Sequence, residues 1–329
     1  MEDNNIMVSI CCITYNQEKF IRQALDGFLM QKTNFKYEII IHDDASTDNT
    51  ANIIREYEKK YPDIIKPIYQ TENQYSKGKK PTLITYKAAQ GKYIALCEGD
   101  DYWIDENKLQ LQVDYMEKNK ECSFCFHDAL ILNIKNNKKE KWKWYNKKYL
   151  KKDGNYNAGE LDLLGFIPTA SYMYRKKYIE NMPEWFKKCI VGDRPLKLIV
   201  SSYGYAHYIN RAMSVYRIGI GNSAMDQIGK NNEERKKAIE YWKKIEWIID
   251  QFDAFSDYKY SKELNIAKDE VQKNILIAKE DFKEIIKVKE YREFLNRKQL
   301  IKIFLKAYFP KKYEKLKHIK LKIKKKERM

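Results

Sequence analysis

The sequence predicts an α/β fold: a Rossmann-like, mostly parallel sheet with flanking helices, followed by a helical C-terminal extension. Two observations carry this prediction. Short apolar runs alternate with amphipathic stretches between residues 7 and 128, a pattern typical of parallel strands joined by crossover helices. From about residue 230 onward, apolar residues recur at helical spacing, as in Ala238, Trp242 and Ile245.

The elements of the sheet follow in order from apolar runs bounded by turn and capping residues. The expected strands are residues 7–13, 37–41, 64–69, 93–97 and 123–127. The expected helices are residues 17–30, a helix through 53–57 after the turn at 43–50, a helix between 81 and 91 with Gly91 as its C′ residue, and residues 108–116. Between about 135 and 190 the pattern loosens and becomes aromatic and lysine-rich.

We therefore expect three regions along the chain. Residues 1–225 form the sheet domain, residues 226–296 a helical region, and residues 297–329 a basic amphipathic tail. The chain of 329 residues carries 63 Lys and Arg against 46 Asp and Glu, a net charge of +17, of which the tail holds +12. The remaining 296 residues carry only +5, which argues against a nucleic-acid surface on the folded body.

The tail has helical spacing of apolar residues, interrupted at Pro310 and resumed through Ile319 and Ile323. Lys298, Lys302 and Lys306 recur on another stripe. A basic amphipathic helix is typical of elements that lie on an anionic membrane surface. A helix packed on its own domain, with a solvated lysine tail, gives the same pattern, and the sequence leaves both interpretations open.

The chain has no stretch approaching the ~18 apolar residues of a membrane-spanning helix, and its acidic start is unlike a secretory signal. Its six cysteines do not form a disulfide framework. Cys122 and Cys125 have zinc-knuckle spacing without a second ligand pair, so we expect buried, inert thiols. The expected location is cytoplasmic, with possible peripheral contact at the cytoplasmic face of the inner membrane.

Polar residues follow three of the expected strands, where parallel sheets bind ligands. Thr14 and Asn16 follow the first strand, Asp43 and Asp44 the second, and Glu98, Asp100 and Asp101 the fourth. Carboxylates this close repel one another unless a cation sits among them. A hard divalent cation, Mn²⁺ or Mg²⁺, is the natural partner, because such ions take carboxylate oxygens and bridge to phosphates.

Simpler interpretations exist for some of these residues. Asp48 lies at the start of the following helix and is expected to cap it. Glu98, Asp100 and Asp101 are more acids than a turn requires. His42 and His127 are expected to be structural. Neither a G-x-G-x-x-G loop nor a Walker A loop is present, so a nucleotide here would be held through metal and carboxylates.

These motifs resemble the inverting family 2 glycosyltransferases of GT-A fold. The resemblance covers residues 7–128 and rests on Ile13-Thr14-Tyr15-Asn16, Asp43-Asp44-Ala45-Ser46-Thr47-Asp48 and Glu98-Gly99-Asp100-Asp101-Tyr102-Trp103 in that order. It implies that Thr14 and Asp44 contact the nucleobase, that Asp100 lies at the ribose and metal, and that Asp101 binds the cation bridging the diphosphate. Glu98 stands where the family has Asp.

A weaker resemblance extends to about residue 217. It places Asp193, in Val191-Gly192-Asp193-Arg194-Pro195, as the catalytic base, although an ordinary turn aspartate before Pro195 would look the same. One carboxylate to deprotonate the acceptor hydroxyl and one metal to stabilise the leaving diphosphate are sufficient for inversion. Gly219 replaces a His that often joins the metal site in relatives, which affects the expected metal dependence.

The resulting expectation is an enzyme that moves a sugar from a nucleotide-sugar donor, by resemblance a UDP-sugar, to a hydroxyl of a glycan or lipid-linked acceptor in bacterial surface polysaccharide synthesis. Two alternatives remain at this stage. One is a sugar-phosphate nucleotidyltransferase, which normally has a glycine- and arginine-rich loop after the first strand. The other is a nucleic-acid-binding protein that uses the basic tail, although no nucleic acid is expected as a partner.

Overall fold

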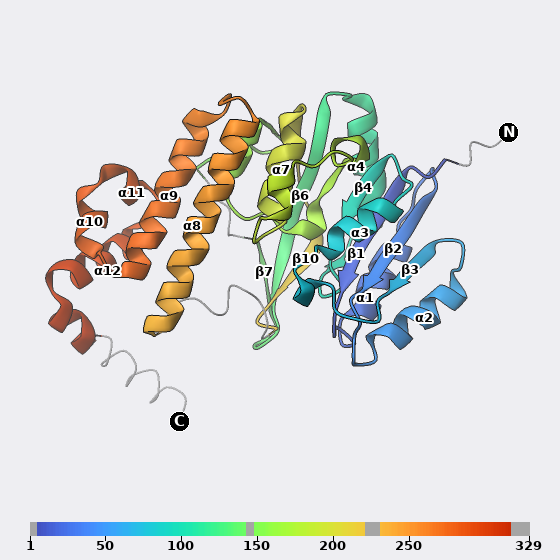
Figure 1. Ribbon diagram of the computed structural model, residues 1–329, viewed down its shortest axis with the longest axis horizontal. Helices are drawn as coiled ribbons and strands as arrows, with labels where there is room; N and C mark the ends of the chain where they lie inside the picture. Colours follow the sequence, from blue (N-terminus) through green and yellow to red (C-terminus); the bar gives the residue numbers. More distant parts are fainter. Residues whose placement is uncertain (1–4, 143–147, 221–230, 317–329) are drawn as a thin grey trace. The chain divides into compact units, whose positions relative to one another are not determined.

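The computed structural model describes residues 5–142, 148–220 and 231–316. The chain divides into two compact units, Met1–Ser223 and Ala224–Met329, which are drawn from blue to yellow and from orange to red in Figure 1. Each unit has its own core, so each is described separately.

The first unit is built on one mixed sheet with the strand order β3-β2-β1-β4-β9-β6-β10-β5. The pairs β1–β2, β2–β3, β1–β4 and β6–β10 are parallel, whereas β9 is antiparallel to both β4 and β6. Short strands β7 and β8 extend from β6 and β10. The strands are β1 Val8–Thr14, β2 Tyr37–Asp43, β3 Ile65–Tyr69, β4 Tyr93–Leu96, β5 Tyr102–Trp103, β6 Cys122–Asn133, β7 Lys138–Lys141, β8 Asn155–Tyr156, β9 Met173–Arg175 and β10 Tyr205–Ile218.

The helices between the first strands cover both faces of this sheet. Alternate residues of β2 point to opposite faces: Ile39 and Ile41 join the core beneath α1 and α2, whereas Ile40 faces the side on which α3 packs. The helices are α1 Ile21–Leu29, α2 Thr50–Lys60, α3 Pro81–Ala88, α4 Lys108–Lys118, α5 Ala158–Leu163, α6 Glu184–Lys187 and α7 Asp193–Ser202, with 3₁₀ turns η1 Tyr75–Lys77, η2 Thr169–Ser171 and η3 Lys176–Tyr178.

The five expected strands and four expected helices of this unit are present, with two differences in detail. The first helix begins at Ile21 rather than at residue 17. The prediction of Gly91 as a helix C′ residue is wrong, because α3 ends at Ala88 and Ala89 has extended backbone. Gly91 instead lies against the first strand, where an added Cβ would come within 2.4 Å of the Ser9 nitrogen. The requirement for glycine there is close packing.

The loosely patterned stretch after residue 135 also contributes to the sheet. β9 lies between β4 and β6, although it is only three residues long, and all three of its residues are buried. The cysteines of this unit are all buried and free, and burial raises the pKa of the Cys11 thiol to about 12, as expected of inert thiols.

The second unit is helical, as the spacing predicts. Its helices are α8 Asn232–Phe255, α9 Ser261–Lys279, α10 Phe282–Lys287, α11 Lys289–Glu293 and α12 Arg297–Tyr308. Helices α8 and α9 pack along each other, with Ile248 and Phe252 buried on α8 and Leu264 and Val271 buried on α9. Within the part of the chain that the structure describes, no helix is both long enough and apolar enough to cross a membrane.

Candidate functional site

The carboxyl ends of β1, β2 and β4 meet at one edge of the sheet. Thr14 pairs with Asp43 in the parallel register of β1 and β2. The Asp44 N–H donates to the Thr14 carbonyl at 3.0 Å, and the Gly99 N–H donates to the Ile13 carbonyl at 3.0 Å. The three sequence motifs, far apart in the chain, therefore form adjacent loops as expected.

Asn16 ties the loop after β1 to the loop after β2. Its backbone has φ of 52°, in the left-handed region that Asn tolerates better than most residues. Its N–H donates to Ser46 Oγ at 2.9 Å, and its Oδ1 accepts the Thr47 N–H at 2.8 Å. Thr14 Oγ1 contacts Gln17 Oε1 at 2.8 Å. These contacts join the two loops at the rim of the site.

Asp44 organises a loop that the sequence did not point to. Its Oδ1 accepts the Gln74 N–H at 2.7 Å, and its Oδ2 accepts the Tyr75 N–H at 3.0 Å. The Asp44 carboxylate thus fixes the η1 turn, and leaves the Tyr75 side chain 72% exposed beside the site. Asp43 is also buried, but its Oδ1 accepts no hydrogen bond from any residue that the structure describes.

Asp48 was expected to cap α2, but it lies one residue before the N-cap Asn49 and contacts the start of the helix from there. Its Oδ1 accepts the Thr50 N–H at 2.9 Å in the first turn of α2, and its Oδ2 accepts the Glu18 N–H at 3.1 Å. Glu18 returns the contact by accepting the Asn49 N–H at 3.0 Å. These bonds satisfy amide groups that a helix start leaves without partners.

Three carboxylates follow β4 and perturb one another. Burial and the nearby Asp100 raise the pKa of Glu98 to about 7. Burial raises the pKa of Asp100, and burial together with Asp100 and Glu98 raises the pKa of Asp101 well above its usual value. Glu98 Oε2 accepts a hydrogen bond from Thr169 Oγ1 at 2.8 Å. Clustered carboxyls with raised pKa values are typical of functional sites.

Arg217, at the end of β10, supplies a cation beside these acids. Its backbone N–H donates to Asp101 Oδ1 at 2.8 Å, and its guanidinium donates to the Asp100 carbonyl and to Gln23 Oε1. The guanidinium lies 4.4 Å from the centre of the Tyr102 ring. The sequence did not point to this role of Arg217, because it depends on the pairing of β10 with β5 and β6.

Asp193 is the first residue of α7 and is half-buried. The pKa of Glu98 is governed first by burial, then by Asp100 and by the hydrogen bond from Thr169. The charge of Asp193 raises it further, so the Glu98 and Asp193 carboxylates share one electrostatic environment. Burial lowers the pKa of Lys80, and the charge of Asp193 partly offsets this effect. The Lys80 Nζ donates to the Cys189 carbonyl at 2.8 Å. Lys80 is a second residue of this region that the sequence did not single out.

The start of α7 is anchored on α5. Asp162, on α5, is fully buried and accepts two hydrogen bonds from Arg194, at 2.9 Å from Nε and 2.6 Å from Nη2. Lys197 Nζ lies 3.8 Å from Asp162 and donates to the Gly165 carbonyl at 2.6 Å. Arg194 directly follows Asp193, so this ion pair fixes the backbone that carries the Asp193 carboxylate.

The family model for glycosyl transferase family 2 matches residues 9–182, more than half of the chain. The chain belongs to glycosyl transferase family 2. The matched region contains all the acidic strand ends, whereas Asp193 and Arg217 lie beyond it. The resemblance stated from the motifs is therefore confirmed at the level of the family.

The curated relatives of this family 2 chain match it over part of its length. An uncharacterized protein of Mycobacterium tuberculosis (strain ATCC 25618 / H37Rv) is 40% identical over 173 residues, 52% of this chain and 47% of its own length. The Escherichia coli UDP-Glc:alpha-D-GlcNAc-diphosphoundecaprenol beta-1,3-glucosyltransferase WfgD is 33% identical over 131 residues, 40% of this chain and 48% of its own. The chain spans about half the length of these relatives.

Solved structures share the fold over most of the chain. S. aureus TarS 1-349, in complex with UDP-GlcNAc, superimposes with a TM-score of 0.62 at 17% identity, covering 92% of this chain and 81% of TarS 1-349. The mannosyltransferase PcManGT of Pyrobaculum calidifontis, in complex with GDP-Man and Mn²⁺, gives 0.53 at 14% identity, covering 94% and 89%. The predicted GT-A fold is confirmed.

Family 2 enzymes of GT-A fold generally use a divalent cation. The oxygen atoms at this site could supply some of the ligands that such a cation needs. Asp101 Oδ2 is buried and accepts no hydrogen bond from the described residues, and the neighbouring donors are carboxylate oxygens, which suit Mg²⁺ or Mn²⁺. Within residues 5–142, 148–220 and 231–316, however, no group of three His, Cys, Asp or Glu side chains could hold an ion by itself. A cation would need ligands in addition to these carboxylates.

The two histidines near the site are buried in the sheet. Burial lowers the pKa of His42 and lowers that of His127 well below its usual value, and His127 Nδ1 lies 2.8 Å from the Asp128 carbonyl. Gly219, directly after β10, has φ of 79°, a conformation in which a histidine would be strained. The backbone at this position therefore favours glycine, and the expectation about metal dependence drawn from Gly219 stays a prediction.

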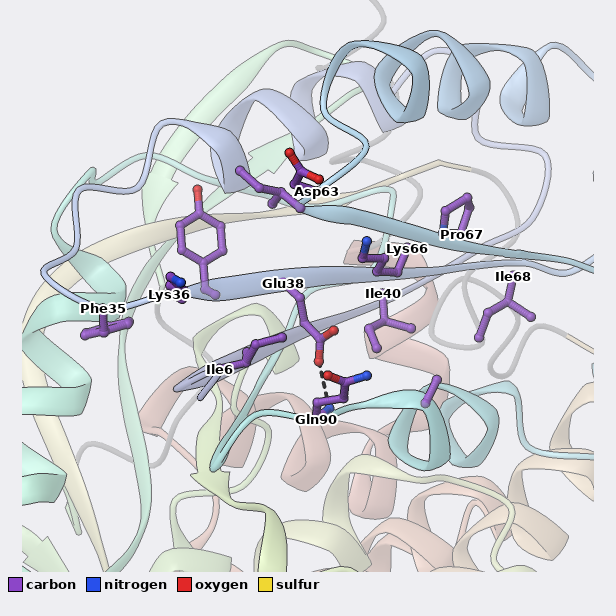
Figure 2. Close-up of a pocket in the computed structure, with 13 residues that line it drawn as sticks. Ile6, Phe35, Lys36, Glu38, Ile40, Asp63, Lys66, Pro67, Ile68 and Gln90 are labelled. Carbon is purple, nitrogen blue, oxygen red and sulfur yellow. Dashed lines mark hydrogen bonds between the residues drawn. The ribbon is translucent and has the colours of Figure 1, made fainter. Parts of the chain in front are cut away.

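A separate groove lies at the opposite ends of the same strands. It has a volume of about 820 Å³ and is lined by residues that include Ile6, Glu38, Ile40, Lys66 and Gln90. Figure 2 shows Glu38 and Ile40 pointing from β2 toward the segment that carries Gln90, whose N–H donates to Glu38 at 2.7 Å. Glu38 is near the start of β2 and Asp43 is at its end, so this groove is not part of the acidic site.

Proposed function

We propose that this family 2 chain is an inverting glycosyltransferase that moves a sugar from a nucleotide-sugar, a UDP-sugar, to a hydroxyl group of a glycan or lipid-linked acceptor. The observation that carries the proposal is that the charges of Asp100 and Asp193 both act on Glu98 beside the acidic strand ends, in a chain whose family is established. The enzyme would serve bacterial surface polysaccharide synthesis at the cytoplasmic face of the membrane.

The choice of donor is supported by what similar proteins bind. TarS 1-349 is described in complex with UDP-GlcNAc, and the name of WfgD specifies UDP-Glc. PcManGT, in contrast, is described with GDP-Man, so the fold accommodates more than one base. In this chain Thr14, Asn16, Asp43 and Asp44 would surround the nucleoside, with the exposed Tyr75 ring next to Asp44 as an additional contact.

The acceptor and setting are supported in the same way. WfgD acts, by its name, on a diphosphoundecaprenol-linked sugar. The Bacillus subtilis relative TuaG, 32% identical over 120 residues, is named a putative teichuronic acid biosynthesis glycosyltransferase. Both names describe the assembly of bacterial polysaccharides, which fits an acceptor hydroxyl on a growing glycan.

In the proposed reaction, Asp193 accepts the proton of the acceptor hydroxyl as its oxygen attacks the anomeric carbon of the donor sugar. The bond from that carbon to the diphosphate breaks, and the nucleoside diphosphate leaves with the bonding electrons. Attack opposite the leaving group inverts the anomeric centre, so a single carboxylate base is sufficient. The Asp162–Arg194 pair holds Asp193 in place, and Arg217 compensates charge at the diphosphate end of the site.

A divalent cation, Mn²⁺ or Mg²⁺, would be held by Asp100 and Asp101, with donor phosphate and water oxygens as its other ligands. Such an ion neutralises charge that develops on the leaving diphosphate. Glu98, held by Thr169, borders this position and would contribute to nucleotide-sugar binding.

The substitution Asp193→Asn tests the base assignment. We expect the variant to lose at least ~100-fold in sugar transfer, since general base catalysis contributes about 10²–10⁴-fold, while its affinity for UDP with Mn²⁺ stays near that of the wild type. Binding is measured by thermal shift with UDP, GDP, CDP and dTDP, each with and without Mn²⁺ or Mg²⁺. Wild-type turnover in Asp193→Asn would contradict the proposal.

The thermal-shift series also tests the donor. A ligand at ~100 times its dissociation constant stabilises the fold by about 2.7 kcal/mol. A metal-dependent shift with UDP alone would support a UDP-sugar donor. A shift with another nucleoside diphosphate instead would show that the donor carries that other base. Absence of any shift would contradict donor binding at the acidic strand ends.

A further inference from the structure

Helix α12 has two apolar faces, and within residues 231–316 the neighbouring helices cover only one of them. On the inner face Ile303 is 6% exposed, and α12 packs against α10. On the outer face Ile301, Phe304 and Tyr308 are 52%, 44% and 46% exposed. A helix that only packs on its own unit needs a single apolar stripe, so the outer stripe calls for a separate explanation.

The outer face carries a cluster of aromatic rings. The Phe304 ring lies 5.0 Å from the Tyr308 ring and 6.1 Å from the Phe309 ring, centre to centre. Phe309 is 43% exposed and Leu316 is 49% exposed. Exposed aromatic and aliphatic side chains gathered in this way mark an interaction surface rather than scattered surface residues.

Basic residues border the same stripe. Lys298 and Lys302, four residues apart on the flank of Ile301, are exposed, as are Lys311, Lys312 and Lys315 after the helix. Glu314 is the one acid between residues 297 and 316. The sequence from 317 to 329, outside the described residues, adds seven more lysines and arginines and one glutamate.

We propose that α12 and the segment after it, residues 297–316, form a docking surface for an anionic lipid bilayer. The aromatic stripe of Phe304 and Tyr308 enters the interface between headgroups and acyl chains, and the flanking lysines contact the negative headgroups. A protein partner would be expected to offer acids in a defined arrangement, whereas a lysine-flanked aromatic stripe matches an extended negative surface. The proposal does not rest on the glycosyl transfer reaction.

Vesicle flotation of the full-length protein tests this surface. One set of vesicles is phosphatidylcholine alone and the other contains ~30% phosphatidylglycerol as the anionic lipid. We expect binding to the anionic vesicles to exceed binding to the neutral ones at least tenfold and to fall as salt is raised. Equal binding to both sets, or to neither, would overturn the proposal.

Two matched pairs of variants locate the contact. Phe304→Ser should weaken binding about tenfold, whereas Tyr258→Ser, which alters an exposed ring of the same unit (65% exposed), should leave it unchanged. Lys298→Glu with Lys302→Glu should weaken binding by fivefold or more per lysine, whereas Lys243→Glu with Lys244→Glu on α8 should have a smaller effect. These residues are exposed, and unchanged thermal unfolding confirms that each variant is folded.

The two pairs also separate this proposal from simpler charge attraction. If the lysine variants lose binding but Phe304→Ser does not, the protein is held only by the charge of its tail, and the docking role of α12 is wrong. If all four variants bind as the wild type does, the surface lies elsewhere. Asp193→Asn should bind vesicles normally, so failure of the transfer reaction and failure of docking remain distinguishable.

Discussion

Arg194 donates two hydrogen bonds to the fully buried carboxylate of Asp162, at 2.9 and 2.6 Å, one residue after the proposed base Asp193. The pair joins α7 to α5, and α5 is itself closed by a capping box between Asn157 and Glu160. The position of Asp193 therefore depends on a carboxylate in another helix. None of the hydrogen bonds described above joins that carboxylate to the acidic strand ends.

Asp162→Asn should destabilise the fold by about 3–5 kcal/mol, because a neutral amide replaces the buried carboxylate that contacts both Arg194 and Lys197. Urea unfolding measures this loss. The matched control is Glu106→Gln, which removes the partner of Lys32 in an exposed ion pair and should cost at most about 1 kcal/mol. Similar losses of unfolding free energy in both variants would show that the buried ion pair contributes no more to stability than the exposed one.

Asp101→Asn should have the opposite effect on the ligand-free protein. Burial, Asp100 and Glu98 all disfavour the charge on Asp101, and an asparagine can still accept the Arg217 N–H at Oδ1. We expect a gain of about 1–2 kcal/mol in unfolding free energy at pH 7 without ligands, together with loss of the stabilisation by UDP and Mn²⁺. A variant that is less stable without ligands would refute the repulsion argument.

Lys108 should make stability rise with pH. Burial lowers its pKa from 10.5 to about 7, so between these values the unfolded chain binds a proton that the folded protein does not. The free energy of unfolding then increases with pH across this window, by up to about 1.4 kcal/mol per pH unit. In Lys108→Met this contribution is absent.

The measurement is the difference in unfolding free energy between wild type and Lys108→Met at pH 7 and pH 9. Comparing the two proteins cancels the contributions of tyrosines and cysteines that titrate in the same range. Gln112 Oε1 loses its donor in the variant, a constant cost of about 1 kcal/mol. Parallel pH profiles for the two proteins would show that Lys108 stays charged in the fold.

Asp44→Ala should loosen the η1 turn without disturbing the sheet. The variant removes the acceptors of the Gln74 and Tyr75 N–H groups, so hydrogen exchange at these two amides should accelerate about tenfold. Asp48→Ala is the matched control, since it releases the Glu18 and Thr50 N–H groups instead. Equal exchange at Gln74 and Tyr75 in both variants would contradict the anchoring role.

The parts of the fold that the sequence predicted are those with local signals. Apolar runs such as Val8–Thr14 identify buried strands, and polar turn residues such as Asp48 precede a helix start. β9 is too short for a periodic pattern, and β10 mixes tyrosines and charged residues, so neither stood out. Gly91 was misassigned because a helix end and a close packing contact both select glycine.

The candidate site shows the same division. The acidic strand ends were predicted because each lies directly after a strand, where parallel sheets bind ligands. Their roles in binding, and that of Asp193 in catalysis, stay predictions. Arg217 and Asp162 could not be found in this way, because each acts on residues more than thirty positions away in the chain, and only the tertiary structure brings them together.

The position of Arg217 has a consequence for biosynthesis. Every acid of the site precedes it in the chain, so a nascent polypeptide that has left the ribosome only as far as β9 already carries Glu98, Asp100 and Asp101 but not the cation that faces them. Mutual repulsion then opposes closure of that edge of the sheet. We therefore expect this edge of the sheet to close only once β10 has emerged and paired with β6, which places completion of the acidic site late in translation.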